Sequence, residues 1–119
     1  TYDTPTTPNR RYYNDAWSTA DGVHWTCHTR SAPWPARSYH DVAVFDERLW
    51  VMEGHYPEGA EPARNHADVW HSVDGIVWDE VPDTPWAPRH AASVFVHADA
   101  LWVVAGNNME SDVWRLSKW

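Results

Sequence analysis

The chain has 119 residues, with nine Lys or Arg against 17 Asp or Glu, and its formal net charge is −8. Because nucleic acids and anionic membrane surfaces attract basic patches, and no run of Lys or Arg is present, we expect neither as a partner. The longest apolar runs, such as Leu101 to Ala105, are too short to span a bilayer. Cys27 is the only cysteine, which excludes an intrachain disulfide and leaves the cellular compartment open.

The ten Trp residues are the unusual feature of the composition, and an internal repeat explains most of them. Eight of them form four pairs with spacings of 53, 53, 52 and 52 residues: Trp17 and Trp70, Trp25 and Trp78, Trp34 and Trp86, Trp50 and Trp102. A third partial copy begins at Asp112-Val113-Trp114, which matches Asp68-Val69-Trp70. A repeat of this length indicates a modular architecture.

The predicted elements are all strands. In chain order they are Ala16–Thr19, Val23–His28, His40–Phe45, Arg48–Glu53, Val69–Val73, Ile76–Val81, Ala92–His97, Ala100–Ala105 and Val113–Leu116. Tight Asp-Gly turns at Asp21-Gly22 and Asp74-Gly75 are expected to close two hairpins. Pro-rich stretches around Trp34 and Trp86 mark loops. No helical periodicity competes with this interpretation.

These residues resemble the kelch family of β-propellers from Asn14 onward. The matching pattern is Arg89-His90, Val94, Leu101 to Gly106 and Asp112-Val113-Trp114, with an earlier copy that starts at Arg37. One departure is that the usual double glycine is replaced by Glu53-Gly54 and Ala105-Gly106. The segment Ser72 to Trp78 is also similar to the Asp-box hairpin of sialidase-like propellers, with one residue missing.

The resemblance implies an all-β fold of four-stranded antiparallel blades, whose strands A to D run from the pore to the rim. Residues 1–119 would form a single propeller segment. Within it, residues 14–29 would be the C–D hairpin of a first blade, 38–81 a complete blade, and 90–119 the A, B and C strands of a last blade. Because propellers have about 4 to 8 blades, the expected partners are copies of the chain or the rest of a longer propeller.

Four repeated residues are candidates for ligand binding. Arg37 and Arg89 would open the A strands at the mouth of the channel, where a guanidinium binds carboxylates in bidentate fashion. The alternative is that each Arg bonds loop carbonyls or an Asp of a neighbouring blade. Trp34 and Trp86 sit in the Pro-rich loops, where they would either contact a ligand or cover a face of the fold.

Glu53 and His55 form the sharpest catalytic hypothesis, because a carboxylate and an imidazole two residues apart share a strand face and could act as acid and base. The second copy has Ala105 and Asn107 at these positions, so packing does not require the pair. We count His55 and Asn107 as ligand-binding candidates too. The alternative is an exposed Glu in a variable loop, and the long segment from His55 to Asn65 suits either a recognition loop or a flexible insert.

We expect no metal and no cofactor, because the eight His residues show no recognisable zinc spacing. The leading interpretation is a binding module that recognises a protein or glycan through loops on one face. The first alternative is a carbohydrate-active enzyme similar to sialic-acid epimerases, with Glu53, His55, Arg37 and Arg89 at the channel mouth. The second is a self-assembling repeat fragment without a ligand.

Overall fold

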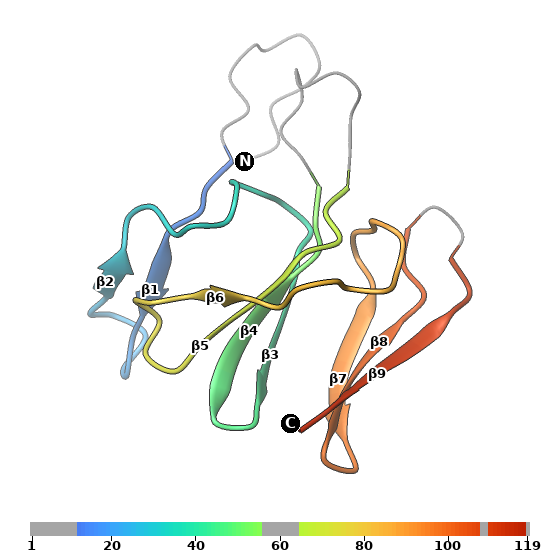
Figure 1. Cartoon of the computed structure of the whole chain (residues 1–119). Helices are drawn as coiled ribbons and strands as arrows, with labels where there is room; N and C mark the ends of the chain where they lie inside the picture. The colour runs from blue at the N-terminus through green and yellow to red at the C-terminus, as the bar shows by residue number, and fades with distance from the viewer. Residues whose placement is uncertain (1–11, 56–64, 108–109, 119) are drawn as a thin grey trace, which may run out of the picture.

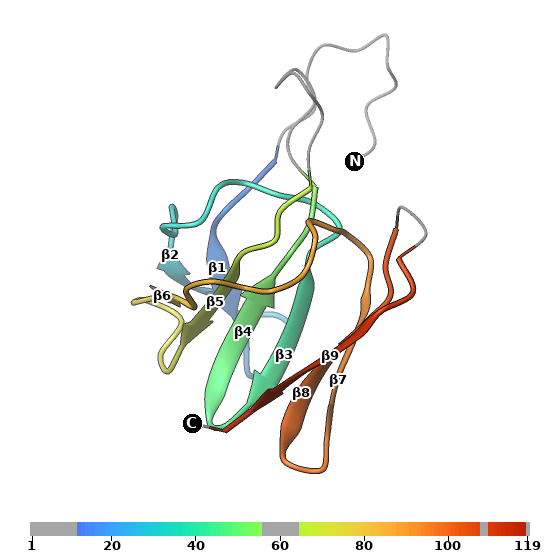
Figure 2. The same cartoon turned by 45° about the vertical axis from the view of Figure 1, so that its right-hand side comes forward.

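A computed structural model describes residues 12–55, 65–107 and 110–118 of the chain. These residues form three antiparallel β-sheets of two, four and three strands that stand side by side in chain order (Figure 1). The same view turned by 45° keeps this order (Figure 2). The described ranges contain no helix, and therefore none that could cross a membrane. The prediction of an all-β fold is confirmed.

Each sheet is a meander in which successive strands are neighbours. The first sheet pairs β1 (Ala16–Ser18) with β2 (Thr26–Thr29). The second has β3 (Asp41–Phe45), β4 (Arg48–Met52), β5 (Val69–Ser72) and β6 (Asp79–Glu80). The third has β7 (Ser93–His97), β8 (Ala100–Val104) and β9 (Val113–Ser117).

Two-residue turns close the β3–β4 and β7–β8 hairpins at the lower end of Figure 1. Asp46 and Glu47 have φ of 50° and 55°, and Ala98 and Asp99 have φ of 49° and 55°. Positive φ at both central residues is the type I′ geometry, whose twist matches that of the flanking strands. We call the opposite end, where the longer connections gather, the loop end.

The expected tight Asp-Gly turns are wrong, because β5 ends at Ser72 and β6 begins only at Asp79. Asp74 Oδ1 accepts hydrogen bonds from the backbone N–H groups of Ile76 and Val77, at 2.8 and 3.0 Å. These side-chain bonds hold a wider loop and replace ladder bonds. The same loop follows β1, so the predicted outer strands 23–28 and 76–81 begin later, as β2 and β6.

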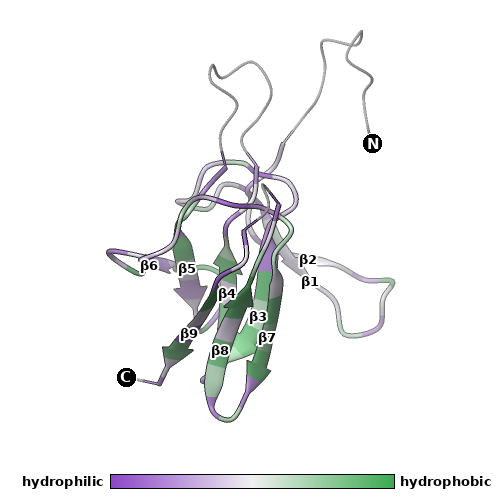
Figure 3. Ribbon diagram, turned by 90° about the vertical axis from the view of Figure 1, so that its right-hand side faces the viewer, coloured by the Kyte–Doolittle hydropathy of each residue, from purple (hydrophilic) through white to green (hydrophobic). Residues whose placement is uncertain are grey.

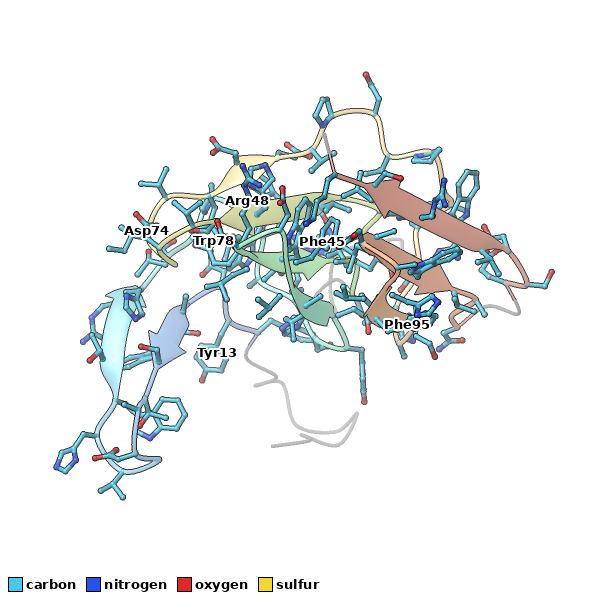
Figure 4. All side chains as sticks on the ribbon, turned by 90° about the horizontal axis from the view of Figure 1, so that it is seen from below. Tyr13, Phe45, Arg48, Asp74, Trp78 and Phe95 are labelled. Atoms are coloured by element: carbon cyan, nitrogen blue, oxygen red, sulfur yellow. The ribbon has the colours of Figure 1, made fainter. Side chains whose placement is uncertain are left out.

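The main core lies between the second and third sheets. It joins Phe45, Trp50, Met52 and Val69 of one sheet to Leu101 and Val103 of the other. Figure 4 shows Phe45 between these two sheets. A smaller cluster on the other side of the second sheet contains Trp34 and Trp78, whose rings meet edge to face with centroids 4.3 Å apart. This geometry is one that aromatic pairs prefer.

Gly54 lies where the second and third sheets meet, and its backbone has a φ of 107°. A Cβ atom added there would lie 2.9 Å from the carbonyl oxygen of Ser38. We expect Gly54→Ala to lower the free energy of unfolding by about 3 kcal/mol, from backbone strain and overlap together. Urea denaturation would measure this.

Gly22→Ala is the matched control, because Gly22 also has a positive φ, of 79°, but open space around its Cβ position. It should cost about 1 kcal/mol, for the strain alone. Equal losses in the two variants would contradict the close approach at Gly54.

Candidate functional site

Arg37 holds the loop end of the second sheet together through its guanidinium group. Nη1 and Nη2 each donate a hydrogen bond to a carboxylate oxygen of Asp68, both at 2.8 Å. Nη1 also donates to the carbonyl oxygen of Glu53 at 2.8 Å, and Nε donates to that of Pro35 at 3.2 Å. Only 1% of the Arg37 side chain is exposed. One buried side chain thus ties together the start of β5, the end of β4 and the preceding loop.

Arg89 repeats this arrangement in the third sheet. Its guanidinium donates to both carboxylate oxygens of Asp112, at 2.6 and 2.9 Å, and to the carbonyl oxygen of Ala105 at 2.8 Å. None of the Arg89 side chain is exposed. We call Arg37, Asp68, Arg89 and Asp112 the Arg–Asp frame. Because each positive charge of the frame already has a carboxylate partner, the frame contributes little net charge to a ligand.

Tryptophans on β5 and β9 complete the frame. Trp70 Nε1 donates to Asp68 at 2.7 Å, and Trp114 Nε1 donates to Asp112 at 2.5 Å. Burial by itself would raise the pKa of Asp68, but the hydrogen bonds from Arg37 and Trp70 lower it overall. Hydrogen bonds from Arg89 and Trp114 likewise lower the pKa of Asp112. Both carboxylates are therefore ionised at neutral pH.

Trp34 and Trp86, the two loop tryptophans, pack against the tryptophans of the frame. Trp34 is 4% exposed, and its ring centroid lies 6.4 Å from that of Trp70. Trp86 is half-buried and lies 6.3 Å from Trp114. In this structure both indole rings lie against the protein instead of extending from the loops.

A second group of polar side chains lies at the loop end beside the frame. Asn65 Oδ1 is 3.1 Å from His55 Nδ1 and 2.7 Å from His90 Nδ1. Asn107 Nδ2 contacts His90 Nε2. The rings of His55 and His90 meet edge to face at 5.3 Å, and the ring of Tyr39 lies 5.7 Å from that of His90. We call these five residues the histidine cluster.

The amide oxygen of Asn65 fixes the tautomers of the cluster. Because this oxygen only accepts hydrogen bonds, both imidazoles must donate to it through Nδ1–H. A neutral imidazole then carries a lone pair on Nε2, and that of His90 accepts from Asn107. Burial and the proximity of His55 lower the pKa of His90, which favours its neutral form.

The cluster occupies positions that the repeat makes equivalent. Ser38 corresponds to His90 and His55 to Asn107, both 52 residues apart. The backbone is paired alike in the two copies: His55 N–H donates to the Ser38 carbonyl at 2.7 Å, and Asn107 N–H donates to the His90 carbonyl at 2.9 Å. The backbone and the Arg–Asp frame are therefore repeated, whereas the side chains displayed beside them differ.

Glu53 does not lie with His55, although only one residue separates them in the sequence. Its side chain is fully buried between the second and third sheets, with Arg89 Nε 3.9 Å from its Oε1 atom. Burial and the neighbouring Asp41 raise the pKa of Glu53 to about 8. Its buried position keeps this titratable group away from any ligand in solution.

A cavity of 1110 Å³ runs from the histidine cluster along β3 toward the first sheet. Tyr39, His55 and His90 line its loop end, and Val42, Val44 and Leu49 line its floor. Figure 4 places Tyr13, another lining residue, between the first two sheets. Within the described residues, no group of three or more His, Cys, Asp or Glu could hold a metal ion.

Sequence reasoning singled out His55 and Asn107 but missed Tyr39, Asn65 and His90 as members of one site. The sequence feature that could have identified His90 is a difference between equivalent positions of the repeat, where one copy has Ser38 and the other has His90. Asn65 carries no such signal, because the two copies differ in loop length there. Most of the proposed recognition loop, residues 56–64, lies outside the described residues.

Comparison with protein-family models and with curated proteins finds no match for this chain. The functional argument therefore depends on the repeat and on the geometry of the loop end.

Removing the negative charge of Asp68 should destabilise the fold, because it leaves the buried guanidinium of Arg37 without its counter-charge. We expect Asp68→Asn to lower the free energy of unfolding by about 3 kcal/mol. The control is Asp46→Asn, since Asp46 pairs with Arg48 at 2.8 Å at a site where both side chains are more than a quarter exposed. That pair should contribute at most about 1 kcal/mol. Similar losses in both variants would contradict a structural role for the frame.

The raised pKa of Glu53 should make stability depend on pH. Between the ordinary value of 4.5 and about 8, the folded chain keeps a proton that the unfolded chain releases, so the free energy of unfolding falls as pH rises. The stability that the protonated Glu53 preserves is fully present below pH 4.5 and is lost above about pH 8. Urea denaturation at pH 5 and pH 9 should show a loss on the order of 3 kcal/mol from this group.

Glu53→Gln is the control for this pH dependence, because the amide keeps the shape and donor of the protonated acid but does not ionise. Histidines with a lowered pKa, such as His66, make the free energy of unfolding rise with pH by the same amount in both proteins, so the wild type should lose stability relative to this variant as pH rises from 5 to 9. Parallel pH profiles for the two proteins would contradict the assignment to Glu53.

Proposed function

We propose that the chain is a segment of a kelch-type β-propeller that serves as a binding scaffold, and that its histidine cluster binds a neutral glycan. The observation that carries this proposal is the contrast at the loop end. The Arg–Asp frame is the same in two copies of the repeat, whereas the residues displayed beside it change from Ser38 to His90 and from His55 to Asn107. Packing alone gives no reason for that change.

The sheet order supports the propeller part of the proposal. The second sheet has four strands in meander order, and the third repeats the first three of them with the same pairings. The sheets stand side by side with their strand faces packed together, as Figure 4 shows from below. This arrangement is typical of adjacent propeller blades.

The chemistry of the cluster favours a neutral ligand rich in hydroxyl groups. Both ring nitrogens of His90 are bonded within the cluster, to Asn65 and Asn107, so the lone pair on Nε2 of His55 is an acceptor that the cluster offers to a hydroxyl group without a fixed charge. The guanidinium groups of Arg37 and Arg89, which would attract an anionic sugar, are already paired with Asp68 and Asp112. Aromatic rings such as Tyr39, which is 47% exposed, offer faces for the C–H side of a sugar ring.

We propose no catalytic role for the site. The enzyme alternative requires an acid and a base that both reach the substrate, and the carboxyl group of Glu53 is fully buried. The binding alternative needs only the residues that the loop end displays.

The proposal can be tested by titrating the labelled protein with neutral and sialylated oligosaccharides while recording NMR spectra. We expect neutral sugars to shift the imidazole signals of His55 and His90. His55→Ala and Asn107→Ala should each weaken binding by about tenfold, which corresponds to one lost hydrogen bond of about 1.4 kcal/mol.

His24→Ala is the matched control, because His24 lies on the loop after β1 with 88% of its side chain exposed. It should leave the affinity unchanged. Binding only of sialylated sugars would contradict the neutral-ligand argument. If no sugar bound while peptides shifted the same imidazole signals, the ligand would be a protein instead.

A further inference from the structure

The chain already contains one interface between two of its own sheets. The third sheet presents Val94, Leu101 and Val103 to the second sheet, which presents Ala43, Phe45, Trp50 and Met52 in return. We call the face that carries Val94 and Leu101 the front of a sheet, and the face that carries Phe45 and Trp50 its back. Successive side chains on a strand point to opposite faces, so every sheet of the repeat has one front and one back.

The front of the second sheet is open along its inner strands. Val42, Val44 and Leu49 are 62%, 69% and 42% exposed. They correspond, 52 residues earlier, to Val94, Val96 and Leu101 on the front of the third sheet. Leu101 is 2% exposed, and Val94 packs against the same core. The second sheet thus leaves uncovered the positions that correspond to Val94 and Leu101, which the third sheet covers, whereas Val96 is itself 48% exposed.

The back of the third sheet is open as well. Phe95 is 46% exposed, and its ring stacks on that of Trp102 with centroids 6.5 Å apart. These residues correspond to Ala43 and Trp50 on the back of the second sheet, where Trp50 is 1% exposed. Figure 3 shows the apolar residues along β3, β7 and β8. Exposed apolar faces of this kind mark interaction surfaces.

We propose that a second copy of this chain docks the back of its third sheet on the front of the second sheet. The two open faces correspond by position to the two sides of the interface that the chain makes within itself, with Phe95 and His97 in place of Ala43 and Phe45. The cavity of 1110 Å³ over Val42, Val44 and Leu49 provides the space for the incoming strands. Because different faces meet, this contact is head to tail.

Docking involves an exchange of β1. The incoming sheet brings β7, β8 and β9, and its β9 takes the position that β1 now holds beside β2. β1 and β9 are copies of the same repeat, since each begins just after the matching Asp15 or Asp112. Among the described strands β1 pairs only with β2, so exchanging it replaces one short ladder with another and gives up the packing of Ala16 against the cluster of Trp34 and Trp78. The product is a four-stranded sheet with the strand order of the second sheet.

This arrangement limits the number of copies in an assembly. Each copy then accounts for two four-stranded sheets: its own second sheet, and one shared with its neighbour. Closed rings of such sheets have about 4 to 8 members. We therefore expect assemblies of two to four copies of the 13.8 kDa chain.

The test is native mass spectrometry of the full chain, with and without a charge on either open face. We expect a defined multiple for the wild type. Val44→Asp on the front and Phe95→Asp on the back should each give a monomer, because a carboxylate cannot be buried there without a partner. An equal mixture of these two variants should give a dimer, since one intact front can still meet one intact back.

Val73→Asp is the matched control, because Val73 is 73% exposed and lies outside both open faces. It should assemble like the wild type. A wild-type monomer at about 100 μM would overturn the proposal. Aggregates that neither face variant alters would overturn it too. None of these outcomes depends on glycan binding.

Discussion

The buried pairing of Arg with Asp is the interaction on which the rest of the loop end depends. In each copy the guanidinium bridges the end of one strand and the start of the next, while it also bonds the loop that enters the sheet. A buried charge without a partner would cost several kcal/mol, so both members must be present together. The Arg–Asp pairs therefore hold the strand ends in place whichever side chains the neighbouring positions display. The histidine cluster can vary for this reason without loss of the fold.

Much of the fold could be predicted from the sequence, because residues that recur in the repeat are those that pack against the same neighbours in each copy. Trp50 and Trp102 recur since their neighbours recur, and the strands around them lie within a residue or two of the predicted bounds. The outer strands were harder. A single Asp side chain, Asp74, takes over backbone N–H groups that a strand would otherwise use, and an Asp-Gly pair alone does not reveal this.

The site was less predictable for a different physical reason. Whether a residue such as Glu53 faces a ligand or the core depends on which sheet packs against it, and that is a tertiary property. His55 and His90 are 35 positions apart, and their imidazoles form one group through the shared Asn65 and through direct contact of the two rings. The sequence shows that the residues at these positions differ between the two copies of the repeat, but it does not show that their side chains lie close together.

The Arg–Asp frame also spans connections of unequal length. The paired residues are 31 positions apart in the second sheet and 23 in the third, a difference of eight, yet the carboxylate geometry is the same. The entropy cost of closing a loop grows only with the logarithm of its length. Lengthening the segment between the paired Arg and Asp should therefore cost little free energy. Foreign recognition sequences could therefore be grafted between His55 and Asn65, which leaves the Glu53 carbonyl, Gly54 and the frame unchanged. For protein engineering, the repeat is a scaffold whose strand ends stay fixed while the loop between them is exchanged.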